Sequence, residues 1–73
     1  MNARRHSISG AIRAADHAGD IHADLERRGQ LIGPYDILIA GHARSQGLVV
    51  ITGDLADFGR VDGLRSEDWL TSP

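Results

Sequence analysis

The run of residues 48–52 is the feature that most constrains what this chain can fold into. It reads LVVIT, with glycines on both sides at Gly47 and Gly53. A short, continuous β-branched run between glycines is typical of a strand that is buried on both faces of a parallel sheet. Such a strand needs a neighbour on each side, and the sequence offers one further candidate strand, within residues 63–70. We therefore predict a short parallel sheet that lacks a neighbour on one side.

A first helix is predicted from about residue 11 to residue 28. Apolar residues recur there at helical spacing, and Gly29 follows a basic pair that suits a helix C-terminus. Ser7 or Ser9 would cap its start. Gly19 lies inside the helical pattern, so the segment is either one bent helix or two. Residues 1–10 are expected to form a polar tail outside the domain.

A second helix is predicted to begin at Pro34, because proline is preorganised for the first helical position. Gly47 is expected to end it. The apolar residues between residues 35 and 40 occupy most of the helix circumference, which predicts a helix buried on several sides. A single helical turn is expected to end at Phe58. The order helix, helix, strand, turn, strand predicts an α/β layer with a parallel sheet.

Size and composition limit the classes of protein to consider. A chain of 73 residues holds at most one domain, whose core supplies only a few kcal/mol. The chain has no cysteine, so disulfides and thiolate zinc sites are excluded. A net charge of -2 argues against a dedicated nucleic-acid binder with a basic stripe. No apolar run approaches the roughly 18 residues that span a bilayer, and no signal peptide is evident, so we expect a cytoplasmic protein with no membrane partner.

Three stretches carry a resemblance to a known family. Residues 25–40 read LERRGQLIGPYDILIA, in which a helix ends in glycine and the next helix carries an aspartate before an apolar stretch. Residues 47–54 read GLVVITGD, a strand ending in threonine with an acid beyond it. Residues 57–64 read DFGRVDGL, and residues 67–69 read EDW. In this order and at this spacing they resemble the PIN domains of VapC-type toxins, over about two thirds of the chain.

The resemblance implies a three-layer α/β fold and a metal-dependent endoribonuclease of a toxin–antitoxin system. It also implies Mg²⁺ or Mn²⁺ held by three or four carboxylates, RNA as substrate, an antitoxin protein as partner, and a homodimer. Two of the family's carboxylates, on an N-terminal strand and a middle helix, have no counterpart in this sequence. We therefore expect residues 11–73 to form the C-terminal half of a PIN-like domain, with two helices and a short parallel sheet, that is weak or inactive alone.

The candidate catalytic residues are Asp36, Asp54 and Asp57, and the first two are the candidate metal ligands. Asp36 is predicted in the first turn of the second helix, and Asp54 just beyond a parallel strand, where open α/β sheets place ligands. Asp57 lies three residues on and would share a helical face with Asp54. Carboxylates suit this role because magnesium takes oxygen ligands. Each acid also has a structural explanation: Asp36 would interact with the helix dipole, Asp54 would cap the next turn, and Asp57 would be a solvated charge.

Other polar and aromatic residues are expected to be structural. The histidines lack the spacing of a metal site: His6, His17, His22 and His42. The acids of the first helix form a solvated face: Asp16, Asp20, Asp24 and Glu26. Three arginines are more typical of surface cations than of RNA contacts: Arg44, Arg60 and Arg65. Phe58 and Trp69 are expected to anchor the core or its edge.

Three functional hypotheses remain open on these residues. The chain is an endoribonuclease domain, a non-catalytic PIN remnant that only dimerises or binds an antitoxin, or a half that gains its missing carboxylates from a separately encoded partner. Metal affinity discriminates between them, because two ligands hold magnesium loosely. We also expect partial folding or oligomerisation, since a lone buried strand needs a second neighbour.

Overall fold

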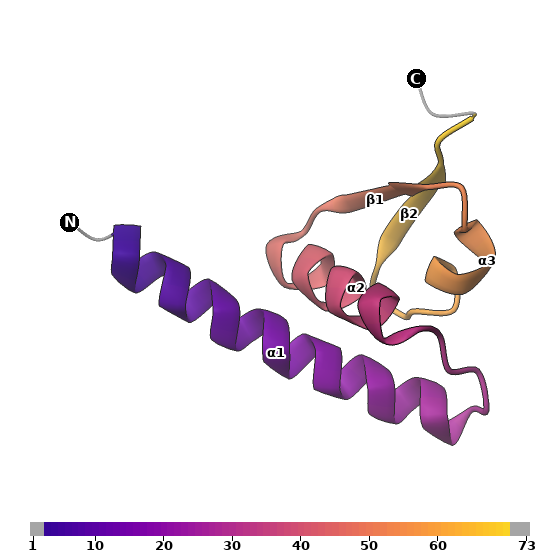
Figure 1. Cartoon of the computed structure of the whole chain (residues 1–73), viewed down its shortest axis with the longest axis horizontal. Coiled ribbons are helices and arrows are strands. Elements are labelled where there is room, and N and C mark those ends of the chain that lie inside the picture. The colour runs from indigo at the N-terminus through magenta and orange to yellow at the C-terminus, as the bar shows by residue number, and fades with distance from the viewer. Residues whose placement is uncertain (1–2, 71–73) are drawn as a thin grey trace.

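A computed structural model gives the structure of residues 3–70, with side chains from residue 12 onward. Its elements are, in order, α1 (Ala3–Arg27), α2 (Pro34–Gln46), β1 (Val49–Thr52), α3 (Leu55–Phe58) and β2 (Arg65–Asp68). Figure 1 shows α1 as a long helix lying along α2, with α2 between α1 and the two strands. The predicted α/β class, with two main helices and a short parallel sheet, is confirmed. Within residues 3–70, no helix is long and apolar enough to cross a membrane.

Helix α1 is a single helix that begins earlier than predicted. It starts at Ala3, so the expectation of a loose tail before about residue 11 is wrong, and Ser7 and Ser9 lie inside the helix rather than at its cap. Hydrophobic periodicity cannot reveal this start, because a polar helix can extend from a packed segment into solvent. The predicted end is confirmed: the helix stops at Arg27, and Gly29 adopts a left-handed φ of 67°. A domain boundary at residue 10 stays a prediction.

Helix α2 has the predicted ends but not the predicted burial. Pro34 occupies its first turn, and Gly47 ends it with a φ of 68°. The helix buries one face, made of Ile37, Ala40, Gly41 and Ala43. Burial on several sides is wrong for the described residues, because Leu38 and Ile39 remain 60% and 49% exposed. No element of residues 12–70 covers them.

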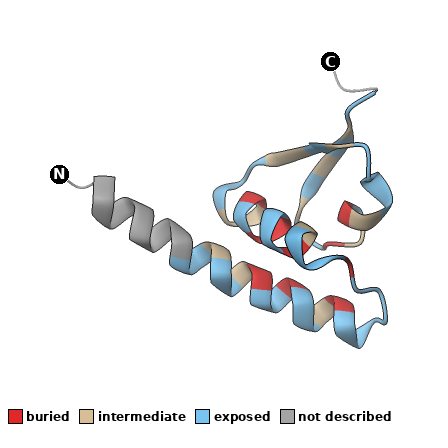
Figure 2. Ribbon diagram, in the orientation of Figure 1, coloured by how far each residue is buried: buried red, intermediate tan, exposed pale blue. Residues whose placement is uncertain are grey.

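Helices α1 and α2 approach each other closely at Gly41. A Cβ atom added there would lie 2.8 Å from the backbone nitrogen of Ala18 and 2.9 Å from the carbonyl oxygen of Ala14. The largest fully buried side chains, Ile21 and Leu25, continue this contact along α1. Figure 2 shows the buried residues of α1 facing α2. The core is completed by residues from the segments that follow: Ile32, Ile37, Ala40, Phe58 and Val61.

Strands β1 and β2 form a two-stranded parallel sheet, with Val49 opposite Arg65 and Thr52 opposite Asp68. The second strand and its parallel pairing are as predicted. Burial of β1 on both faces is wrong for the described chain, because Ile51 remains 51% exposed. Parallel strands are normally covered on both faces. The sheet within residues 3–70 therefore has one neighbour for β1, and one of its faces is open.

Arginine side chains tie the segment after α3 to the helices. Arg44 of α2 donates to Nδ1 of His17 at 2.8 Å and to the carbonyl oxygen of Asp62 at 2.9 Å. Arg60 donates to the carbonyl oxygen of Leu31 at 3.3 Å. Two of the three arginines considered as surface cations, Arg44 and Arg60, therefore hold loops in place, whereas Arg65 is exposed on β2.

Candidate metal centre

Three aspartates that are separated in sequence converge near the C-terminal end of β1. Asp36 lies in the first turn of α2, Asp54 follows β1, and Asp57 lies in α3. One carboxylate oxygen from each lies within 4.8 Å of the others. These are the three residues singled out from the sequence. Among the residues that the structure describes, no other group of three acidic, histidine or cysteine side chains is arranged in this way.

The local backbone explains where Asp36 and Asp54 point. The start of α2 is held by the N–H of Ile37, which donates to the carbonyl oxygen of Gly33 at 3.0 Å, and Asp36 is half-buried beside it. The N–H of Asp54 donates to Oγ1 of Thr52 at 2.8 Å, which shapes the turn after β1. Asp54 stands at the N-cap of α3 but makes no side-chain cap hydrogen bond. Its carboxylate is exposed and therefore accessible to a ligand.

Asp57 has a second contact besides the other two acids. Its Oδ1 lies 3.9 Å from Nη1 of Arg60, and 29% of its side chain is exposed. A pair this long and this accessible contributes little stability. Arg60 nevertheless offsets part of the negative charge of Asp57, so the three carboxylates are not equivalent.

The pKa of Asp54 is raised above its usual value of 3.8. The largest cause is the side-chain hydrogen bond with Asp57, and the negative charges of Asp57 and Asp36 act in the same direction. Carboxylates that face one another disfavour their joint ionised form unless a proton or a cation intervenes. The donor set consists only of carboxylate oxygens, which hard divalent cations such as Mg²⁺ prefer. The residues present therefore fit a site for such an ion.

Trp69 packs against Gly53, the residue that precedes Asp54, and lies outside the core. Its side chain is against Gly53, where an added Cβ would lie 2.6 Å from Nε1 of the indole. The backbone N–H of Trp69 donates to the carbonyl oxygen of Thr52 at 3.1 Å. Phe58 is a core residue as predicted, at 4% exposure, but Trp69 is 61% exposed and does not anchor the core. The contact with Gly53 was missed from the sequence, although both residues follow paired parallel strands and so lie at one edge of the sheet.

Comparison with known proteins decides the family. The sequence profile of the PIN domain matches residues 3–64. The chain belongs to the PIN domain family. It is similar to the tRNA(fMet)-specific endonucleases VapC of Shigella flexneri and Salmonella typhimurium, at 55% and 57% identity over 56 residues, 77% of this chain and 42% of each relative. The chain thus spans less than half the length of these curated relatives.

Solved structures support the same assignment of the PIN fold. The DNA-bound VapBC from Salmonella typhimurium superposes with a TM-score of 0.74 at 56% identity, covering 78% of this chain and 43% of that one. VapBC-1 from nontypeable Haemophilus influenzae gives a TM-score of 0.76 at 34% identity, covering 81% and 44%. The arrangement of α1, α2 and the parallel strands is therefore that of part of a PIN domain.

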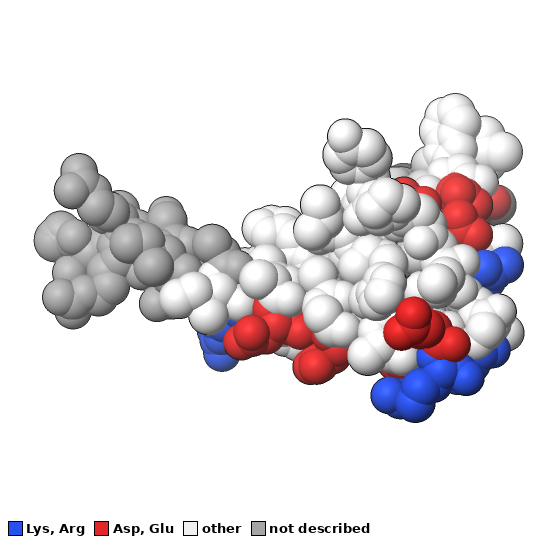
Figure 3. All heavy atoms as spheres, turned by 60° about the horizontal axis from the view of Figure 1, so that its bottom comes forward, with Lys and Arg blue, Asp and Glu red and all other residues white. Residues whose placement is uncertain are grey.

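The remaining polar residues of this PIN domain lie outside the acidic cluster. His17 is half-buried and accepts the hydrogen bond from Arg44, whereas His22 and His42 are exposed; the side chain of His6 is outside the described residues. On α1, Asp24 pairs with Arg27 at 2.9 Å and with Arg28 at 2.6 Å. The other acids of the predicted solvated face are exposed: Asp16, Asp20 and Glu26. Figure 3 shows charges gathered along one edge and one end of the molecule, with few between them.

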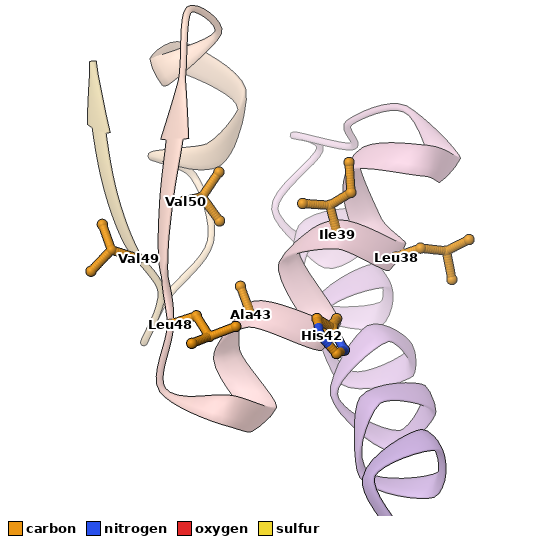
Figure 4. Close-up of a pocket in the computed structure, with 7 residues that line it drawn as sticks. All are labelled: Leu38, Ile39, His42, Ala43, Leu48, Val49 and Val50. Atoms are coloured by element: carbon orange, nitrogen blue, oxygen red, sulfur yellow. The ribbon is translucent and has the colours of Figure 1, made fainter. Parts of the chain in front are cut away.

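A shallow apolar groove lies between α2 and β1 and is separate from the acids. Its volume is ≈ 440 Å³, and its lining residues are Leu38, Ile39, His42, Ala43, Leu48, Val49 and Val50. Figure 4 shows Val50 pointing from β1 toward α2, and Val49 pointing to the other side of the strand. None of the three aspartates lines this groove. It is therefore not part of the candidate metal centre.

Proposed function

We propose that this chain carries part of the active site of a VapC-like, metal-dependent endoribonuclease, in which Asp36 and Asp54 hold Mg²⁺ or Mn²⁺ and Asp57 lies beside them. The observation that carries this proposal is the convergence of the three carboxylates within 4.8 Å in a PIN domain. The names of the relatives support RNA as the substrate: VapC of Shigella flexneri is a tRNA(fMet)-specific endonuclease, and VapC2 of Haemophilus influenzae is a ribonuclease.

The carboxylates suit phosphodiester hydrolysis because that reaction needs a neutralised phosphate and an activated water. A divalent cation bound here would polarise a phosphoryl oxygen and lower the pKa of its bound water. Asp36 and Asp54 are the ligands without a competing ion pair in the described structure, whereas Asp57 is shared with Arg60. We assign Asp36 and Asp54 as metal ligands. Asp57 is a third acid that adds negative charge beside them.

We further propose that the 73-residue chain binds the ion weakly and cleaves RNA slowly or not at all when alone. Magnesium held by few carboxylates keeps most of its water shell and is bound loosely. Asp54 is exposed, so the described residues do not exclude water from the site. A second candidate is a non-catalytic module that dimerises or binds an antitoxin, which is favoured by the exposed apolar side chains Leu38 and Ile39.

The partners in this proposal are an antitoxin protein, a second copy of the chain, and RNA, in the cytoplasm. Support for the antitoxin comes from the matching VapBC structures. The groove between α2 and β1 offers apolar surface for a protein contact. Partial folding or self-association of the isolated chain follows if this surface is uncovered, and sedimentation at several concentrations measures it. A monomer with a sharp, concentration-independent thermal transition would contradict this part of the proposal.

An RNA cleavage assay separates the two candidate functions. Pure chain is incubated with RNA and Mg²⁺ or Mn²⁺, beside the Asp36→Ala variant and an Asp20→Ala control from the exposed face of α1. Slow cleavage that is lost in Asp36→Ala and kept in Asp20→Ala supports the endoribonuclease. Cleavage that persists in Asp36→Ala contradicts the assigned site. Absence of both RNA cleavage and Mn²⁺ binding in the folded parent favours the non-catalytic module.

A further inference from the structure

The exposure of Trp69 is unusual for the largest aromatic side chain of a chain that has few of them. The sequence holds one tryptophan, one tyrosine and one phenylalanine. Large aromatic side chains dominate the energetics of cores and interfaces. Phe58 follows this rule, at 4% exposure, whereas Trp69 leaves 61% of its surface open. The tryptophan therefore stabilises the core little and presents a ring surface to solvent.

The position of this ring is set by the turn that carries Asp54. Atoms Nε1, Cδ1 and Cε2 of the indole would lie 2.6, 3.1 and 3.7 Å from a Cβ added at Gly53. The pyrrole edge is thus seated on the glycine, and any larger residue would occupy that space. Gly53 directly precedes Asp54, and consecutive Cα atoms are about 3.8 Å apart. The glycine on which the indole rests is therefore the residue that directly precedes the candidate metal ligand.

We propose that Trp69 is a stacking platform for a base of single-stranded RNA whose phosphate lies at the acidic cluster. This inference rests on the proposed function. Proteins that bind single strands place bases on aromatic side chains, and they recognise RNA most often where bases are unstacked. An indole on the glycine that precedes Asp54 lets a base rest on the ring while the neighbouring phosphate reaches a cation held by the acids.

Charge alone is a poor alternative source of RNA affinity in this chain. The net charge is -2. Arg60 already donates to the carbonyl oxygen of Leu31 and pairs with Asp57. Arg28 donates to the carbonyl oxygen of Arg60 at 2.7 Å and pairs with Asp24. Stacking needs no free arginine or lysine, because every base has a π-face that can lie on an aromatic ring. The exposed ring is therefore the feature that best supplies contact with a nucleotide.

The experiment uses the fact that Trp69 is the sole tryptophan, so its fluorescence reports on this position. A short single-stranded oligoribonucleotide and an abasic oligomer of the same length are titrated into the full chain, with and without Mn²⁺. We expect saturable quenching by the RNA and much less by the abasic oligomer. By anisotropy of the labelled RNA, Trp69→Ala should weaken affinity about 5- to 150-fold, the range measured for loss of one stacked base. Trp69→Phe should keep part of the affinity.

A matched control separates stacking from general apolar contact. Leu70→Ala removes an apolar neighbour that is 75% exposed but has no π-face, and it should leave RNA affinity unchanged. Equal RNA affinity of Trp69→Ala and the parent, or equal quenching by both oligomers, would overturn the proposal. So would loss of Mn²⁺ binding in both Trp69 variants, which would assign the ring to holding the Asp54 turn. Failure of the parent to bind Mn²⁺ refutes the proposed metal site instead. The RNA affinities of the parent and Trp69→Ala, compared without Mn²⁺, then still test whether a base stacks on the ring.

Discussion

Replacement of Gly41 by alanine tests the close contact on which the packing of α1 against α2 depends. The added methyl carbon would lie 2.8 Å from the nitrogen of Ala18, 2.9 Å from its Cβ, and 2.9 Å from the carbonyl oxygen of Ala14. Two of these atoms belong to the backbone of α1 and cannot move by side-chain rotation. The two helices must therefore separate, which also loosens the packing of Ile21 and Leu25.

The magnitude follows from a matched substitution in the same helix pair. Alanine at a helical glycine gains about 1 kcal/mol from helix propensity. At Gly19, where an added Cβ meets no atom within 4 Å, this gain should appear as increased stability. At Gly41 the same gain is opposed by an overpacking cost of about 1–3 kcal/mol or more. The variants Gly19→Ala and Gly41→Ala should thus differ by about 1–3 kcal/mol, with Gly41→Ala the less stable.

Urea unfolding followed by far-ultraviolet circular dichroism measures this difference directly. The core of so short a chain supplies only a few kcal/mol. A measurable fraction of Gly41→Ala should therefore be unfolded at room temperature even without urea. Equal free energies of unfolding for Gly41→Ala and Gly19→Ala would refute the close helix contact.

Three further predictions concern the core and the candidate site. Leu25→Ala should lower the free energy of unfolding by about 2–5 kcal/mol, whereas Ile12→Ala, at a side chain 58% exposed, should change it little; urea unfolding of both checks this. Because the pKa of Asp54 is raised, the protonated Asp54 carboxyl is favoured in the folded state relative to the unfolded state. This preference stabilises the fold fully below pH 3.8, and the stabilisation is lost as the pH rises through the raised pKa. Asp54→Asn should therefore be more stable than the parent at pH 7, and the difference should shrink as the pH falls toward 3.8. A constant difference would contradict the interaction of Asp54 with Asp57 and Asp36 as the cause of the raised pKa. Gly53→Ala should displace Trp69, seen as a shift of its fluorescence maximum, and an unchanged spectrum would contradict the seating of the indole on the glycine.

Local signals in the sequence explain most of the element boundaries. Pro34 and the left-handed Gly47 determine the ends of α2 through their own backbone preferences, so no knowledge of tertiary structure is needed. The start of α1 could not be predicted in this way, because residues 3–11 carry no apolar repeat in the sequence. The exposure of Ile51 and Leu38 could not be predicted either. An apolar pattern predicts which residues prefer burial, not whether the chain supplies the element that covers them.

The candidate site illustrates the same division between local and tertiary information. Asp54 could be placed at a strand end from the pattern around it, and Asp36 in a first helical turn. Their approach to within 4.8 Å depends on how α2 packs beside β1, which is a property of the tertiary structure. The resemblance to the PIN family supplied that information for the acids. It supplied none for the contact of Trp69 with Gly53, which depends on the parallel register of β1 and β2.

Titration of Mn²⁺ into the full chain at pH 7 tests most directly whether the converging carboxylates form a metal site. The parent should bind Mn²⁺ weakly at a single class of site, and Asp36→Asn should lose that binding. Asp20→Asn removes the same charge from the exposed face of α1 and should bind Mn²⁺ as the parent does. Equal Mn²⁺ affinity of the parent and Asp36→Asn would contradict the metal centre proposed for this PIN domain.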